Sequence, residues 1–287
     1  MQILVNMISL SAFYVSFALG LALIFGVMRT INLAHGEFYM LGGYVLWLVV
    51  VVLKGIVPGP AIFMVALVVG CSTVGLLGLL LQLSLFRVLR SQPFAILMAT
   101  LGLSYIIQVL VMQFIGPMGR SVPTLFRGFI RTETMIIPYQ RLAVAGLVFV
   151  AITVLWIFLT RTKPGRTVRA VAQNPRGAIL QGISLARVSA MTMLIGTGLA
   201  AFSGILIGSI NSVHPFMGTD ALWRAFIIII VGGVGSIPGA AIAAVLFAVL
   251  DTSLNATGMG HLAPMIDALL MLGVLSFLPH GLMGTRE

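Results

Sequence analysis

Acidic side chains are scarce in this 287-residue sequence, which holds only six Asp and Glu residues. One of them, Glu37, follows Asn32 and His35 in the run NLAHGEF, at the start of a long apolar segment. Asn32 can cap a helix that begins at Leu33, which would place His35 and Glu37 in its first turns. A carboxylate inside a bilayer is costly enough to make Glu37 a candidate functional group.

A structural role is the alternative for each acidic residue in the apolar segments. Glu37 can complement the dipole of its helix, alone or paired with Arg29. Asp267 follows Pro264 in the first turn of the last apolar segment, where the same dipole explains it, and the signal from Asp251 is as weak. Both interpretations of Glu37 stay open on its residues alone.

Hydroxyl and amide side chains recur on one face of another apolar segment. Thr100, Ser104 and Gln108 stand four residues apart in PFAILMATLGLSYIIQ, so they share one face of a helix. A polar face can line a pathway through the membrane. Thr and Ser can equally return hydrogen bonds to their own backbone, and this alternative stays open.

Glycines interrupt a further apolar stretch, FIIIIVGGVGSIPGAAIAAVLF. Gly232, Gly233, Gly235 and Pro238 lie in its first half and favour a break in the helix. Irregular backbone at membrane depth occurs only where protein buries it or where it lines a watery cavity. We expect a break that offers free backbone groups to a substrate from the outward side, with a kinked helix as the alternative.

Positive charge is concentrated in residues 161–187, which hold six of the sixteen Lys and Arg residues and no acidic one. Short loops of this kind stay on the cytoplasmic side of a membrane. Asn174 and Pro175 together signal a helix start and Gly182 a stop, which predicts about two turns of helix between them. A shorter helical run is expected at residues 168–173.

The residues of this loop allow two uses. The loop can lie on anionic lipid headgroups, because basic juxtamembrane segments bind them. It can also dock a soluble partner protein. A helix of two turns is marginal by itself, so either use requires that something hold it in place.

The composition specifies the elements that must position these groups. With 60% hydrophobic and 8% charged residues, the chain cannot be an ordinary water-soluble globule. We expect an all-α, polytopic membrane protein with residues 1–287 in a single transmembrane domain. Eight stretches reach the length of about 20 residues that a spanning helix needs, namely residues 4–28, 33–53, 61–86, 94–116, 141–160, 188–210, 225–250 and 262–279.

The charges outside these segments predict topology rather than a nucleic-acid partner. The net charge is +10, but no basic residue lies deep within the predicted segments. With residues 161–187 inside, counting segments places both termini and residues 117–140 on the outer side. Residues 117–140 mix Arg with Phe and Ile, which is typical of an interfacial helix or a lid, or else of a docking surface for an external protein.

Small residues at four-residue spacing predict where helices pack closely. Two segments carry such stripes, and we expect tight packing of both, with each other as one arrangement. The stripes are Gly196, Ala200, Gly204 and Gly208 in the first segment, and Ser236, Ala240, Ala244, Ala248 and Thr252 in the second.

Three stretches carry a resemblance to a known family. NLAHGEF, GRTVRAVAQNPRGAILQGISLARV and VGGVGSIPGA resemble the permease family of branched-chain amino acid ABC transporters, in particular its first, H-type subunit. The likeness extends from Gly20 to about Gly281. Gly177 departs from it, since many relatives carry more helix-favouring residues there, and this weakens the short helix by about 1 kcal/mol.

The resemblance implies a role for each candidate residue. Contact with an ATPase subunit would fall to Arg169, Asn174, Pro175, Ala178 and Gly182. The translocation pathway would include Asn32, His35, Glu37, Thr100, Ser104, Gly232, Gly233 and Gly235.

The resemblance also implies partners and a location. We expect two ABC ATPase subunits, a second related permease subunit in a heterodimer, an external substrate-binding protein and membrane lipid, with no cofactor and no nucleic acid. The chain would be a multi-pass protein of the bacterial cytoplasmic (inner) membrane. It would be a transport subunit and no enzyme, and it would import branched-chain or related small amino acids, with urea, amides and aromatic acids as open alternatives.

Rival functions make different demands on the sequence. A secondary transporter or channel that works alone would show an inverted repeat or several buried ionisable residues, and no clear repeat is detected. Lys54 and Lys163 are the only lysines, and neither belongs to a phosphate-binding Gly-x-x-x-x-Gly-Lys motif. ATP hydrolysis is therefore expected on another chain. Neither a metal-binding cluster nor a catalytic arrangement of nucleophile and base is evident.

Overall fold

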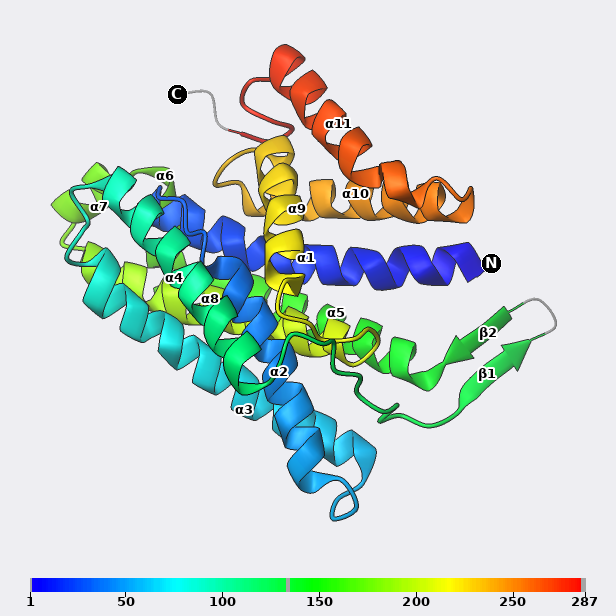
Figure 1. Ribbon diagram of the computed structural model, residues 1–287. Helices are drawn as coiled ribbons and strands as arrows, with labels where there is room; N and C mark the ends of the chain where they lie inside the picture. The colour runs from blue at the N-terminus through cyan, green and yellow to red at the C-terminus, as the bar shows by residue number, and fades with distance from the viewer. Residues whose placement is uncertain (1, 133–134, 285–287) are drawn as a thin grey trace.

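The computed structural model describes residues 2–132 and 135–284 as an all-α bundle with one small hairpin (Figure 1). Eight helices in this part of the chain are long and apolar enough to cross a membrane, which confirms the predicted fold class. The helices are α1 (Gln2–Met28), α2 (His35–Leu53), α3 (Gly59–Leu81), α4 (Pro93–Phe114), α5 (Tyr139–Arg161), α6 (Lys163–Gln173), α7 (Pro175–Leu180), α8 (Leu185–Gly208), α9 (Met217–Gly232), α10 (Ile237–Ala256) and α11 (Ala263–Phe277). A π-helical turn, Gln82–Phe86, extends α3, and a 3-10 turn, Gly260–Leu262, precedes α11.

The seventh predicted segment consists of two helices, as its glycines and proline indicate. Helix α9 begins at Met217, earlier than the sequence predicts, and has 16 residues. The chain then leaves helical geometry, with positive φ angles at Gly233 and Gly235. The Ser236 hydroxyl accepts a hydrogen bond from the Gly239 amide at 3.2 Å and so caps α10. In Figure 1, α9 crosses α1 while α10 runs alongside it.

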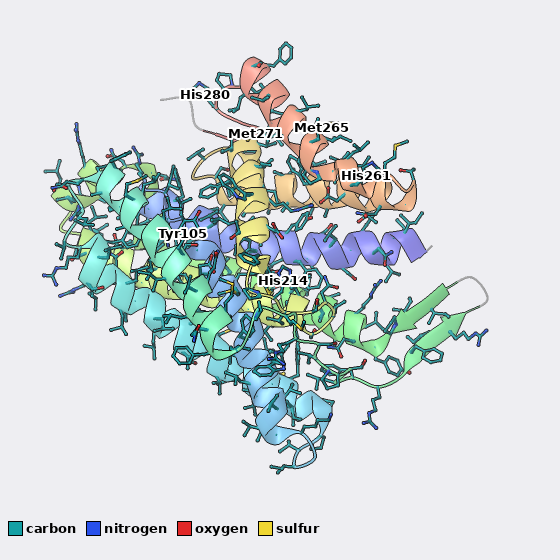
Figure 2. The ribbon with its side chains drawn as sticks, in the orientation of Figure 1. Tyr105, His214, His261, Met265, Met271 and His280 are labelled. Carbon is teal, nitrogen blue, oxygen red and sulfur yellow. The ribbon has the colours of Figure 1, made fainter. Side chains whose placement is uncertain are left out.

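Helix α9 changes the predicted topology. A Cβ atom on Gly26 would lie 3.5 Å from Gly235 and 3.8 Å from Ala172 of α6, so α10 starts on the side of residues 161–187. Helix α10 leads away from that side, and α11 leads back to it. Figure 2 places His261 and His280 at opposite ends of α11. The prediction that the C-terminus lies on the same side as the N-terminus is wrong, because α9 returns the chain to the side of residues 161–187 before α10 begins.

Both predicted stripes of small residues do pack tightly, but against a common neighbour. A Cβ on Gly196 of α8 would overlap Ile24 and the Gly20 carbonyl of α1, and one on Gly204 would overlap the Tyr39 carbonyl of α2. Helix α10 packs mainly against α1 and α9. The two striped helices do not form a main pair, because α1 lies between them (Figure 1).

The described residues of the outer loop, residues 117–132 and 135–140, do not form the interfacial helix, and its use as a lid stays a prediction. It contains an antiparallel hairpin, β1 (Phe129–Thr132) and β2 (Met135–Pro138), which projects from the bundle (Figure 1). Gly128 before β1 has a φ of 106°, and Pro138 cannot donate a backbone hydrogen bond, so a continuous helix cannot form here. Arg120 pairs with Val213 and ties this loop to the segment after α8.

Candidate functional site

Glu37 lies at the centre of a buried polar cluster that joins three helices. Its side chain is 1% exposed, and Oε1 accepts hydrogen bonds from Ser104 Oγ at 2.7 Å and Gln108 Nε2 at 2.8 Å. Gln108 also donates to Thr219 Oγ1 at 2.9 Å. The cluster thus connects α2, α4 and α9.

All three polar residues on this face of α4 contact the chain at or just before the start of α2. Thr100, Ser104 and Gln108 are all buried, as a shared face predicts. Thr100 Oγ1 accepts a hydrogen bond from the Leu33 amide at 3.2 Å and donates one to the Leu97 carbonyl at 3.1 Å. Thr100 therefore bonds the backbone of its own helix, as the structural alternative predicts, and also contacts the chain just before α2.

Helix α2 begins two residues later than the sequence predicts. Asn32 Oδ1 accepts a hydrogen bond from the Ala34 amide at 3.1 Å, while Thr100 binds the Leu33 amide. These two contacts hold residues 32–34 in a turn, so Asn32 stabilises the entry to the helix without serving as its N-cap. His35 is the first helical residue, is fully buried and stacks on Phe17 at 5.2 Å.

The predicted short helix in the basic loop is present with the expected boundaries. Asn174 Oδ1 accepts a hydrogen bond from the Gly177 amide at 2.9 Å, and Pro175 is the first residue of α7. Gly182 has a φ of 78°, and its amide donates to the Ile179 carbonyl at 2.9 Å. The Asn174 cap and the Gly182 stop therefore delimit α7 as predicted.

The two faces of α7 differ in exposure. Ala178 is buried, whereas Ile179 is 49% exposed and Leu180 is 85% exposed. Arg169 is exposed on the neighbouring helix α6. Helix α7 therefore presents an apolar tip beside basic side chains.

Helix α6 is longer than the predicted run at residues 168–173. It begins at Lys163, because the Thr162 side chain caps it by accepting a hydrogen bond from the Gly165 amide at 3.1 Å. Pro164 occupies the first turn, where its missing amide proton costs nothing. Thr162 and Pro164 together are the start signal that the prediction missed.

Several backbone groups at the break between α9 and α10 are hydrogen-bonded within the protein. The carbonyls of Val231 and Gly232 accept hydrogen bonds from the amides of Leu282 and Met283 at 2.8 and 3.0 Å. The Ser236 amide donates to the Gly233 carbonyl at 2.9 Å. The break also lies toward residues 161–187 rather than outward. The segment after α11 binds two of these carbonyls, and the link of the break to a substrate path stays a prediction.

A charged cluster that sequence reasoning missed joins α1, α9, α10 and α11. Arg224 Nη1 donates hydrogen bonds to Tyr14 Oη and to Asp251 Oδ2, and Tyr14 donates to Asp251 at 2.5 Å. Asp267 Oδ2 lies 3.8 Å from the same Nη1. Arg224 lies in the middle of α9, one residue before the start of the predicted segment at residue 225, so the predicted segments did not reveal a basic residue within a helix. The sequence offers one signal for this cluster: Arg224 stands beside an apolar run, and a basic residue within a membrane helix needs acidic partners.

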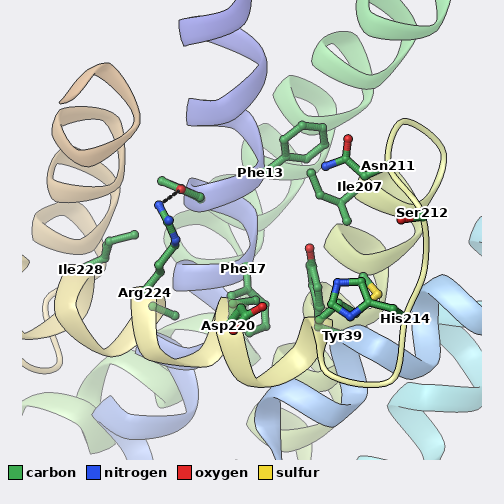
Figure 3. A pocket seen from close by; sticks show the side chains of 14 residues that line it. Phe13, Phe17, Tyr39, Ile207, Asn211, Ser212, His214, Asp220, Arg224 and Ile228 are labelled. Carbon is green, nitrogen blue, oxygen red and sulfur yellow. Dashed lines mark hydrogen bonds between the residues drawn. The ribbon is translucent and has the colours of Figure 1, made fainter. Parts of the chain in front are cut away.

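A cavity of about 490 Å³ lies beside this cluster (Figure 3). Phe17 and Tyr39 form an aromatic wall, with ring centroids 5.0 Å apart. His214, Asp220 and Arg224 supply polar groups around the same hollow. His35 stacks on Phe17, so this ring contacts both the cavity and the residue that begins α2.

Comparisons with known proteins agree with this architecture. The chain matches the family model "Branched-chain amino acid transport system / permease component" over residues 3–276. It is 29% identical over 296 residues to the high-affinity branched-chain amino acid transport system permease protein LivH of Escherichia coli (strain K12), covering 100% of this chain and 96% of the relative. It is 30% identical over 297 residues to the corresponding protein BraD of Pseudomonas aeruginosa, again covering 100% and 96%.

A more distant relative matches over a shorter stretch. The ribose import permease protein RbsC of Bacillus subtilis is 29% identical over 116 residues, which is 38% of this chain and 36% of that protein. The family match over most of the chain and the eight apolar helices lead to one conclusion. This chain is a multi-pass membrane protein of the ABC permease type and belongs to the family of permease components of branched-chain amino acid transport systems.

Proposed function

We propose that this chain is the permease subunit of an ATP-driven importer that carries a branched-chain or closely related amino acid across the bacterial cytoplasmic membrane. One observation carries the proposal. Helix α7 is a preformed element, capped by Asn174 and closed by Gly182, and it exposes Ile179 and Leu180. An exposed apolar tip beside basic side chains suits the cleft of a soluble partner, which would bury it.

The partners follow from the number of such elements. This chain supplies one α7, whereas a pair of ATPase subunits presents two equivalent clefts, and closed assemblies are normally symmetric or nearly so. We therefore include two ATPase subunits and a second, related permease subunit, with ATP hydrolysis on the ATPase chains. An external substrate-binding protein would deliver the amino acid on the side of the β1–β2 hairpin.

Two groups of residues have separate roles in this proposal. Coupling to ATP hydrolysis belongs to the α6–α7 residues Arg169, Asn174, Pro175, Ala178 and Gly182. The inner gate belongs to the buried polar cluster, Asn32, His35, Glu37, Thr100 and Ser104. The break between α9 and α10 contains Gly232, Gly233 and Gly235 and lies near Gly26 and α6. This position supports a role in the movement of α9 rather than in contact with substrate.

The docking surface can be tested by changing its most exposed side chain. Leu180→Glu should reduce co-purification with the ATPase subunits at least about tenfold, because it places a charge where an apolar contact is expected. Met118→Glu is the matched control, since Met118 is 79% exposed on the outer side. Normal co-purification of the Leu180→Glu variant would contradict the proposal.

A transporter that works alone is the second candidate function. The buried carboxyl groups of Asp251 and Asp267, with the partly exposed Arg224, favour it, because ion-coupled transporters need ionisable groups at membrane depth. Vesicles that contain only permease chains separate the two. Leucine uptake without ATPase subunits and ATP would support the rival, and strict dependence on both would exclude it.

A further inference from the structure

Asp220 indicates where water reaches the middle of the bundle. It is exposed and lies one helical turn from Arg224 in α9. Arg224 hydrogen-bonds Tyr14, near the midpoint of the 27-residue α1, so this part of α9 stands near mid-depth (Figure 1). An exposed carboxylate at that depth cannot face lipid without a large cost. The cavity that Asp220 lines is therefore a hydrated space.

Arg224 is oriented by its neighbours without being saturated by them. Among the described residues, its hydrogen bonds and ion pairs with Tyr14, Asp251 and Asp267 all involve Nη1. Nε and Nη2 remain as donors, and the side chain is 31% exposed. A planar guanidinium with donors left over is well suited to a carboxylate.

The charges around the cavity restrict the ligand further. Asp220 and Arg224 line the cavity, while Asp251 and Asp267 contact Arg224 without lining it, so three carboxyl groups accompany one guanidinium. A simple anion would meet this excess of acidic groups, so a ligand carboxylate needs a positive group beside it. Side chains four residues apart on a helix lie about 5–6 Å apart at Cβ, so Asp220 and Arg224 can receive adjacent charges of opposite sign.

The remaining wall is apolar. Phe13, Phe17, Ile207 and Ile228 line the cavity beside the polar groups of α9 (Figure 3). The volume of about 490 Å³ lies within the range of about 300–1,000 Å³ that is usual for small-molecule sites. An aliphatic group of a few carbons can be buried here next to a charged end.

We propose that this cavity binds an α-amino acid with an apolar side chain, whose carboxylate is received by Arg224 and whose ammonium group pairs with Asp220. The inference rests on the proposed function and deepens it, because it gives the permease a recognition site of its own. Tyr14 and Asp251 act as positioning residues that hold the guanidinium toward the cavity.

The test measures binding of radiolabelled leucine to the complete transporter complex in vesicles without the external binding protein. Saturable binding is expected, and Asp220→Asn and Arg224→Lys should each weaken it about tenfold or more. Arg127→Gln removes a charge elsewhere on the outer side and should leave binding unchanged. 3-Methylbutylamine lacks the carboxylate and 4-methylpentanoate lacks the ammonium group, so both should compete at least about tenfold more weakly than leucine.

Each outcome decides the inference. Asp220 is exposed, so Asp220→Asn should fold even where an Arg224 variant does not. Absence of leucine binding, or unchanged binding in Asp220→Asn, would overturn the site. Equal competition by the amine would show a cation site instead. If import with the external binding protein still requires ATP while direct binding is absent, the site is wrong and the proposed function stands. Failure to import any branched-chain amino acid would contradict the proposed cargo itself.

Discussion

Helix α7 and the cluster around Arg224 are both polar sites within an apolar protein, but they are built in opposite ways. The contacts that delimit α7 lie within nine residues, from the Asn174 cap to the Gly182 stop. The Arg224 cluster takes one residue from each of four helices that are distant in sequence. A site made by sequence neighbours can be changed without disturbing the bundle, whereas one made by distant helices also holds the bundle together.

The largest expected effect comes from breaking the cluster at Asp251. Asp251→Ala leaves Arg224 with the Tyr14 hydroxyl and with Asp267, 3.8 Å away, as its remaining acidic partner in the cluster. Loss of one partner of a buried ion pair costs about 3–5 kcal/mol, and the lower end applies because Arg224 is partly exposed. Thermal unfolding in detergent measures the loss. Ser253→Ala, at an exposed neighbouring position, should change stability by less than about 0.5 kcal/mol. Equal stability of the two variants would show that the Arg224 cluster does not hold the bundle together.

The next effect separates coupling from folding at α7. Gly182 and Gly258 both have a φ of 78°, and neither has a neighbour within 4 Å of an added Cβ. Alanine at either position should cost about 1–2 kcal/mol of local strain. Only Gly182→Ala should reduce transport relative to ATP hydrolysis, as should Asn174→Ala, which removes the cap. Both activities are measured in the same reconstituted vesicles. Similar loss of coupling in Gly258→Ala would mean that strain alone is responsible.

A smaller effect is expected at Glu37, which lies in the first turn of α2 and accepts hydrogen bonds from α4. Glu37→Gln keeps an oxygen that accepts from Ser104 and Gln108, so the fold should survive while the negative charge is lost. Transport should slow by about tenfold, equivalent to about 1.4 kcal/mol, with no change in substrate binding to the external protein. Ser104→Ala should show part of this effect, and the exposed Ser84→Ala should show none. Normal transport in Glu37→Gln would make the cluster structural.

The same contrast explains which features the sequence predicts. The boundaries of α7 follow from Asn174 and Gly182 because a cap and a stop act within one turn of their own position. The buried face of α4 follows from the spacing of Thr100 and Ser104. That this face meets Glu37 does not follow, because periodicity within one helix carries no information about its neighbour.

Helix α9 shows most clearly which helices hydropathy fails to predict. The first half of α9 contains the charged residues Asp220 and Arg224. Charged residues are typical of loops, so the predicted transmembrane segment began only at residue 225. These charges are tolerated because Asp220 is exposed and lines a cavity, and because carboxylates on α10 and α11 pair with Arg224. Both conditions arise only once the bundle is assembled. The missed helix then produced the wrong position for the C-terminus.

The smallest effect concerns Gly177 and sharpens the account of α7. Alanine there should gain about 1 kcal/mol of helix propensity. Its Cβ would lie 2.9 Å from Asn174 Nδ2, so it would displace the side chain that caps the helix, and loss of a cap costs about 1 kcal/mol. Gly177→Ala alone should therefore leave coupling nearly unchanged. In an Asn174→Ala background the cap is already absent, and the same change should restore part of the lost coupling, measured as transport per ATP hydrolysed. Identical effects of Gly177→Ala in both backgrounds would mean that the cap and the helix do not share this contact.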